Sequence, residues 1–132
     1  MKRFKFLCIL LIILATNSYA SDGFKCVVKD ARSPDQSGEL KVDDFYITFV
    51  GKEFTVDRKT GKMLGALKNH EYYGSPKVLN TGSEKNSFRV ITLYQPSVIF
   101  DYLTVETYNE KSDMPFIFVS SSTVVSGVCS SY

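Results

Sequence analysis

The side chains best suited to chemistry are a single histidine and the residues beside it. His70 stands next to Glu71 and close to Tyr72 and Tyr73. Such a loop could hold an acid–base site, because histidine titrates near neutral pH. It could also be a recognition loop, because tyrosine supplies contact area at low entropic cost. A third interpretation is a surface loop in which one tyrosine caps the end of a barrel, and we favour it because most loop residues carry no function. Among the functional interpretations, His70, Tyr72 and Tyr73 form our candidate recognition loop.

The acidic residues do not form a recognisable catalytic or metal-binding motif. Asp43–Asp44, Asp57, Asp101 and Glu106 are scattered along the chain and lack the spacing of a calcium loop. The sequence also has no nucleophile elbow around a serine, no glycine-rich phosphate loop and no basic–aromatic motif for RNA. We therefore predict no catalytic residue, no metal ion and no cofactor.

The first twenty residues have the pattern of a cleaved export signal. Three basic residues stand in the first five positions, an apolar run covers 6–15, and small residues follow at Ser18 and Ala20. The apolar run is too short to cross a bilayer, which needs about twenty residues. We expect residues 1–20 to be a signal peptide and 21–132 to form a single domain without a membrane span. The expected location is periplasmic or secreted, in a bacterium.

Signal cleavage would leave two cysteines, Cys26 and Cys129, at opposite ends of the mature chain. In an oxidising compartment such a pair predicts one structural disulfide. A reactive thiol or a metal site is the alternative, but the sequence has no C-x-x-C motif to support it. The chain-entropy model assigns about 4–5 kcal/mol, as an upper figure, to a bridge that closes so long a loop.

The charge of the mature chain argues against nucleic acid as a partner. The 132-residue sequence has 16 basic and 14 acidic residues, and three of the basic ones lie in the predicted signal. Removing the signal leaves 13 basic against 14 acidic residues, a formal charge of −1. A nearly neutral domain has no bulk electrostatic attraction to nucleic acid or to anionic lipid.

Short segments rich in Val, Ile, Phe, Tyr and Thr, separated by polar turns, predict an all-β domain. A polar connection is expected over Ala31–Asp44. The spacing of apolar residues disfavours a long amphipathic helix and allows a short one near Gly65–Tyr72. The predicted strands are Phe24–Lys29, Tyr46–Val50, Glu53–Asp57, Lys62–Ala66, Lys77–Asn80, Ser87–Tyr94, Ile99–Tyr108, Pro115–Ser120 and Thr123–Cys129.

One turn has a clear chemical signature. Between two of the predicted strands lies Arg58–Gly61, preceded by Asp57. Gly61 can adopt the left-handed conformation that closes such a loop, and the Asp57 carboxylate can accept backbone N–H bonds there.

The sixth and seventh predicted strands form the clearest hairpin. A register that places Val90 opposite Leu103 gives one apolar face. On the other face Arg89 lies diagonal to Glu106, close enough for a predicted cross-strand ion pair. One apolar and one mixed face are typical of an antiparallel sheet with a wet side.

The same register places an apolar cluster on the face opposite Val90 and Leu103, which is expected to face solvent. Ile91 lies opposite Tyr102, and Leu93 lies opposite Phe100. Such a patch, if exposed, indicates a surface for a partner or ligand. The alternative, which we favour because uncovered patches are rare on monomers, is that Ala31–Asp44 or Gly65–Tyr73 folds over it. These four residues are our candidate partner surface.

About eight strands in sequence predict an antiparallel meander that closes into a small barrel, with a two-sheet sandwich as the alternative. In this arrangement Cys26 and Cys129 would join the first and last strands and so close the sheet.

Several stretches resemble a group of small exported bacterial proteins without an assigned function. They are Phe24-Lys25-Cys26, Phe54 to Gly61, Asn86-Ser87-Phe88, Tyr102 to Val105 and Ser126 to Cys129. The resemblance spans most of the mature chain and implies no site, because these motifs are structural. A weaker likeness is to the periplasmic inhibitors of C-type lysozyme, which are disulfide-stapled eight-stranded barrels. Their inhibitory S-G-x-x-Y pattern is absent here, so no residues are carried over.

We expect an exported binding module without catalytic activity, whose partner is an unidentified protein or small ligand. One alternative is an inhibitor of a hydrolase such as lysozyme, which would use the loop Asn69–Pro76. The other is a small hydrolase that uses His70 with a carboxylate.

Overall fold

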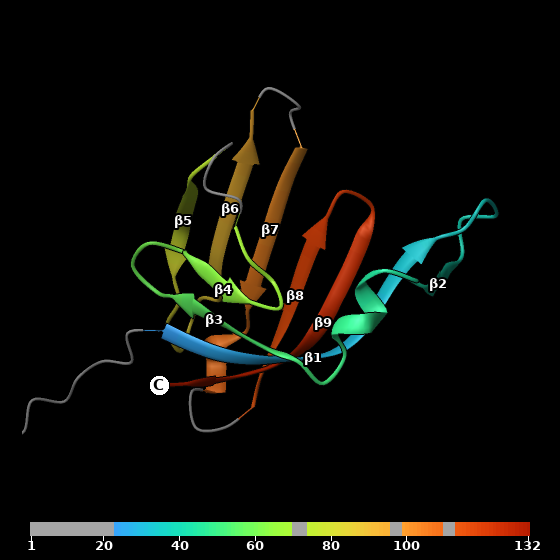
Figure 1. Cartoon of the computed structure of the whole chain (residues 1–132). Coiled ribbons are helices and arrows are strands. Elements are labelled where there is room, and N and C mark those ends of the chain that lie inside the picture. The colour runs from blue at the N-terminus through green and yellow to red at the C-terminus, as the bar shows by residue number, and fades with distance from the viewer. Residues whose placement is uncertain (1–22, 70–73, 96–98, 110–112) are drawn as a thin grey trace, which may run out of the picture.

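The computed structural model describes residues 23–69, 74–95, 99–109 and 113–132, so the predicted signal peptide lies outside it (Figure 1). In these ranges the chain is all-β, as the sequence predicts, with two short 3-10 helices. The elements in chain order are β1 (Gly23–Pro34), β2 (Leu40–Val42), η1 (Tyr46–Phe49), β3 (Glu53–Asp57), β4 (Met63–Gly65), β5 (Pro76–Thr81), β6 (Phe88–Tyr94), β7 (Ile99–Val105), η2 (Thr107–Asn109), β8 (Met114–Ser120) and β9 (Thr123–Ser131).

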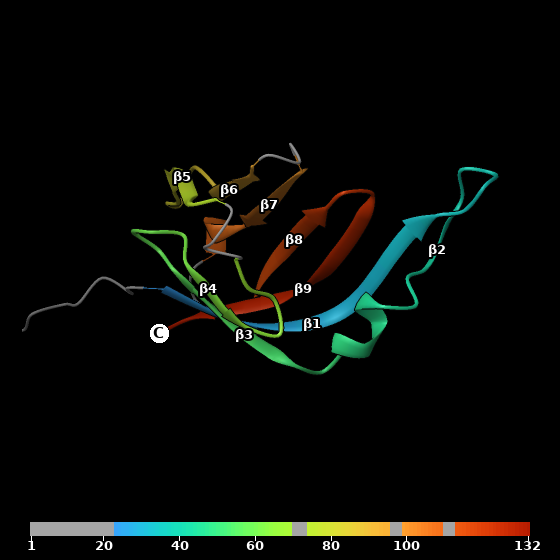
Figure 2. The ribbon, with the colours of Figure 1, turned by 45° about the horizontal axis from the view of Figure 1, so that its top comes forward.

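The described strands form one antiparallel sheet in the order β4-β3-β1-β9-β8-β7-β6-β5, with β2 paired to β1. From β5 to β9 each strand lies beside its neighbour in the chain, as a meander requires, and β9 then pairs with β1. The sheet curves into a half-barrel (Figures 1 and 2). Full closure would also need a β4–β5 pair, but these two strands are the edges of the sheet. The predicted closed barrel is therefore corrected to an open one, and a two-sheet sandwich is wrong for the part of the chain that the structure describes.

The β6–β7 hairpin has the predicted register. Val90 lies opposite Leu103, and both are buried. The predicted ion pair is not formed: Arg89 Nε donates to Ser87 Oγ at 3.1 Å, and no ion pair within the described ranges joins Arg89 to Glu106. Glu106 lies beyond the end of β7, while Ser87 is two residues from Arg89 and within easier reach.

The β3–β4 turn also has the predicted chemistry. The Asp57 carboxylate accepts the N–H groups of Lys59 (2.9 Å) and Thr60 (2.7 Å). Gly61 has φ +74°, the left-handed region in which a side chain is strained. A Cβ at Gly61 would also collide with Val90 Cγ2, so this turn packs closely against β6.

The segment Tyr46–Val50, predicted as a strand, forms η1 instead. The Asp43 side chain accepts the N–H groups of Phe45 (3.0 Å) and Tyr46 (2.7 Å) and so fixes a turn where an extended chain was expected. Side-chain acceptors of this kind compete with strand pairing. The aromatic and β-branched residues of this segment favour a strand, but the local contact with Asp43 outweighs that preference.

The polar connection expected over Ala31–Asp44 is partly strand. β1 continues to Pro34 and pairs with β2, and Asp35 Oδ1 accepts the N–H groups of Ser37 (2.8 Å) and Glu39 (3.1 Å) in the turn between them. This hairpin projects from the body of the half-barrel (Figures 1 and 2). The helix allowed near Gly65–Tyr72 is not formed over 66–69, and 70–73 lie outside the described residues.

The predicted disulfide joins Cys26 to Cys129 across β1 and β9, over a sequence separation of 103 residues. Both cysteines are buried in the core. Because β1 and β9 are interior neighbours of the sheet, the bridge does not close the barrel, and that part of the prediction is wrong. Around it, Phe24 packs on Phe88, and Phe54 packs on Phe116, each with ring centroids 5.1 Å apart.

Side chains bridge the open edge between β4 and β5. Arg58 Nε donates to the Thr81 carbonyl (2.6 Å), and its Nη2 donates to the Gly82 carbonyl (3.0 Å). The same guanidinium lies 5.2 Å from the centroid of the Phe24 ring. The two edges are thus held together without a strand ladder, and the interior of the half-barrel keeps an opening.

Candidate ligand pocket

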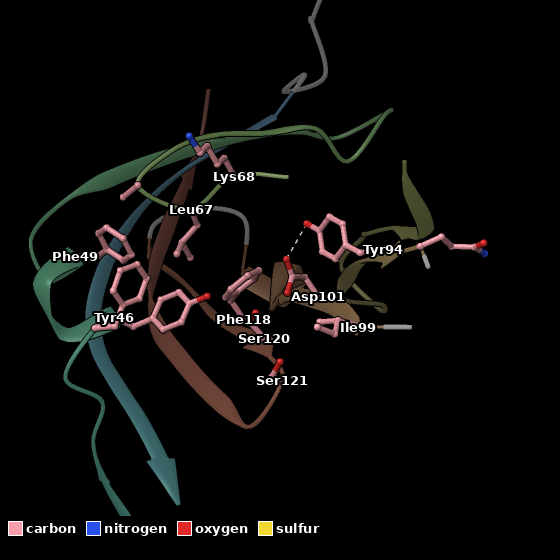
Figure 3. Close-up of a pocket in the computed structure, with 13 residues that line it drawn as sticks. Tyr46, Phe49, Leu67, Lys68, Tyr94, Ile99, Asp101, Phe118, Ser120 and Ser121 are labelled. Atoms are coloured by element: carbon pink, nitrogen blue, oxygen red, sulfur yellow. Dashed lines mark hydrogen bonds between the residues drawn. The ribbon is translucent and has the colours of Figure 1, made fainter. Parts of the chain in front are cut away.

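A pocket of about 720 Å³ lies in the concave side of the half-barrel, between η1, the segment after β4 and the β6–β7–β8 part of the sheet (Figure 3). Small-molecule sites in proteins commonly have volumes of about 300–1,000 Å³. We call it the half-barrel pocket. Its lining residues are Phe45, Tyr46, Phe49, Ala66, Leu67, Lys68, Tyr94, Gln95, Ile99, Asp101, Phe118, Ser120 and Ser121.

One wall of the pocket is an aromatic cluster on and beside η1. The rings of Phe45, Tyr46 and Phe49 meet edge to face, with centroids 5.1 to 5.8 Å apart. Phe45 is 65% exposed, which is unusual for so large an apolar side chain with aromatic neighbours. Such rings offer a rigid apolar surface to a ligand.

Asp43 holds this wall in place. Besides the two backbone N–H groups at the start of η1, its carboxylate accepts the Thr123 hydroxyl at 3.0 Å, which ties η1 to β9. The N–H of Tyr46 is the main cause that lowers the pKa of Asp43 below its usual 3.8, with Thr123 adding to it. A charged Asp43 therefore positions the aromatic cluster at neutral pH.

The segment after β4 forms a second wall, and Asn69 fixes it. The buried Asn69 side chain accepts the N–H of Met63 and donates through Nδ2 to Thr92 Oγ1 at 3.0 Å. These bonds connect β4 to the inner face of β6 across the open edge of the sheet. Leu67 is thereby packed into the core, and Lys68 stands at the rim.

The polar end of the pocket is a tyrosine–aspartate pair. The Tyr94 hydroxyl donates to Asp101 Oδ2 at 2.8 Å (Figure 3). Asp101 is 8% exposed, and no group in the described ranges donates to its other oxygen, Oδ1. Buried polar atoms are normally hydrogen-bonded, so an orphaned carboxylate oxygen in a pocket needs a partner. Asp101 can accept a hydrogen bond from a ligand.

The candidate partner surface predicted from the sequence lies on the other face of the sheet. Ile91 pairs with Tyr102 and Leu93 with Phe100, as expected. Leu93 is 43% and Phe100 47% exposed, whereas Ile91 and Tyr102 are half-buried. Residues 66–69, one segment expected to cover the patch, contribute to the concave side instead. The patch remains a predicted partner surface, separate from the half-barrel pocket.

The predicted recognition loop is not part of the described structure. His70, Tyr72 and Tyr73 lie outside the described residues, so the inhibitor and hydrolase alternatives that use this loop stay predictions. Within the described ranges, no group of three or more His, Cys, Asp or Glu side chains is placed to hold a metal ion.

The pocket does not follow from the sequence alone, although part of its signal is readable there. The β6–β7 register places Tyr94 and Asp101 on the same inner face, where a carboxylate is out of place. The aromatic wall is not apparent from the sequence because Tyr46–Val50 has the composition of a strand. It lines the same pocket as Phe118 and Ser120 of β8, which lie more than sixty positions away in the chain, and no local pattern encodes that proximity.

Comparison with known proteins does not assign this chain to a family. No protein family, curated protein or solved structure matches this chain. Among the described residues there is no helix long and apolar enough to cross a membrane.

Proposed function

We propose that this chain is an exported binding module, without catalytic activity, that takes a small ligand with a largely apolar body into the half-barrel pocket. The observation that carries the proposal is the pocket itself: a concave space of ligand size with aromatic and aliphatic walls and few polar groups. This combination is typical of small-molecule sites at the mouths of β-barrels.

The way the walls are built supports the same proposal. Asp43 anchors η1 to β9, and Asn69 anchors the segment after β4 to β6. A pocket whose walls are fixed by buried or local hydrogen bonds loses little entropy when a ligand enters, because the binding shape exists beforehand.

Nile red, an uncharged dye whose emission shifts in apolar surroundings, tests the proposal. We expect the mature protein to bind it with a blue shift, and Ser120→Phe to abolish most of that binding because the added ring fills the pocket. Ser122→Phe is the matched control: the same substitution two residues away, on an exposed residue that does not line the pocket. Leu93→Lys controls for dye held on the outer face.

Two results would contradict the proposal: no binding of Nile red, or equal binding by Ser120→Phe and Ser122→Phe. If Ser120→Phe does not fold, Ala66→Phe fills the pocket from a different wall and is judged by the same comparison.

A further inference from the structure

The half-barrel pocket contains one acceptor that no described residue uses. Asp101 receives the Tyr94 hydroxyl on Oδ2, and its Oδ1 has no partner in the described part of the chain. The residue is more than nine-tenths buried, although it lines the pocket. A buried carboxylate oxygen without a hydrogen bond carries the full cost of its lost hydration, which makes the absence of a donor among the described residues informative.

The placement of the basic side chains also indicates that Asp101 lacks a partner among the described residues. The ion pairs between described residues join Lys25 to Glu53, Arg32 to Asp30 and Lys41 to Glu39, and none involves Asp101. Lys68 also lines the pocket, but its ammonium group points away from Asp101 in Figure 3. A carboxylate in a poorly solvated site is stabilised by an opposite charge that also donates a hydrogen bond.

The rest of the lining accepts a cation with an apolar body. Tyr46, Phe49 and Phe118 contribute aromatic rings, and Leu67 and Ile99 contribute aliphatic surface. Aromatic faces attract ammonium groups through their quadrupole, so these walls do not oppose a positive charge near Asp101.

From this arrangement we infer that the ligand is a small amphipathic amine, whose protonated nitrogen donates to Asp101 Oδ1 while its apolar body packs between η1 and β8. This inference rests on the proposed function and adds the chemical class of the ligand.

Displacement of Nile red by three compounds with the same eight-carbon chain tests the ligand class. They are octylamine, which is protonated at neutral pH, octanol, which is uncharged, and octanoate, which is anionic. We expect octylamine to displace the dye at a concentration about tenfold or more below octanol, as hydrogen bonds to charged groups imply, and octanoate to be the weakest.

Two variants test whether Asp101 causes the preference for octylamine over octanol. Asp101→Asn keeps the size of the side chain and an oxygen for Tyr94, and we expect it to bring octylamine to within about twofold of octanol. Asp44→Asn makes the same substitution at an exposed carboxylate that does not line the pocket, so its preference for octylamine should remain. If Asp101→Asn does not fold, the comparison of the three compounds on the unmodified protein decides the question by itself.

The outcomes separate the two proposals. If Nile red binds, Ser120→Phe blocks it, and octylamine is no better than octanol, then the pocket binds ligands but the inferred amine class is wrong. The inference is also wrong if Asp101→Asn keeps the full preference for octylamine. If Nile red does not bind, or Ser120→Phe leaves it bound, the proposed function itself fails.

Discussion

At the scale of single residues, three aspartates illustrate different uses of one side chain. Asp57 accepts backbone N–H groups in a turn, and Asp43 does the same at η1 and also binds Thr123. Asp101 lines the pocket with one oxygen that accepts no hydrogen bond from the described residues. The first use was predictable, because its partners are two and three residues away. The third depends on which face of β7 becomes the inside of a barrel.

The lowered pKa of Asp43 predicts a dependence of stability on pH. Because the folded-state pKa is below the usual 3.8, the stabilisation by charged Asp43 is fully present well above that usual value and is lost as pH falls through the folded-state pKa. The drop in melting temperature between pH 5 and pH 3 should therefore be smaller for Asp43→Asn than for the unmodified protein. Thermal unfolding followed by circular dichroism over that range measures the effect.

Asp44→Asn is the control for this experiment, since Asp44 accepts none of the three hydrogen bonds of its neighbour Asp43. Asp35 and Asp57 also have lowered pKa values, through the Ser37 side chain and the Thr60 N–H respectively, so part of the acid sensitivity should remain. An unchanged pH profile in Asp43→Asn would show that η1 does not depend on a charged Asp43.

At the scale of elements, the two edges of the sheet replace a missing strand pair with side-chain contacts. Arg58 reaches from the end of β3 to the carbonyls of Thr81 and Gly82, and Asn69 reaches Thr92 on β6. A continuous ladder here would close the barrel, whereas side-chain bridges hold its edges together and leave room for the pocket.

Arg58→Ala should lower the free energy of unfolding by about 2 kcal/mol, because it removes two charge-assisted hydrogen bonds and a cation–π contact. Lys cannot reproduce the forked geometry, so Arg58→Lys should recover only part of the loss. Urea unfolding measures both. Lys59→Ala, an exposed neighbour, should change the free energy by less than about 0.5 kcal/mol. Equal losses for Arg58→Ala and Lys59→Ala would refute the bridging role.

At the scale of the whole molecule, one covalent link holds together the two ends of the described chain. The Cys26–Cys129 disulfide is compatible with a periplasmic or extracellular environment, where such bonds persist. It spans almost the full length of the β domain, so it restricts the unfolded chain strongly.

Replacing both cysteines with alanine should lower the free energy of unfolding by up to about 4–5 kcal/mol, the value that the chain-entropy model gives for a loop of this length. Urea unfolding of the double variant beside the oxidised protein measures the difference. In the native host, intact mass should correspond to a chain without residues 1–20 and two hydrogens lighter than the dithiol. A product that retains the signal, or that carries two free thiols, would overturn the expected export and oxidation.

The sequence by itself determined the all-β class, most strand positions, the β6–β7 register, the Asp57–Gly61 turn and the disulfide. Alternation and turn chemistry depend on residues close together in the chain. The disulfide follows because two cysteines can pair in only one way. Only the tertiary structure decided that β4 and β5 stay unpaired, that Tyr46–Phe49 is helical and that Asp101 faces a pocket. Each of these depends on contacts between segments far apart in the chain, whose energies no local pattern of residues records.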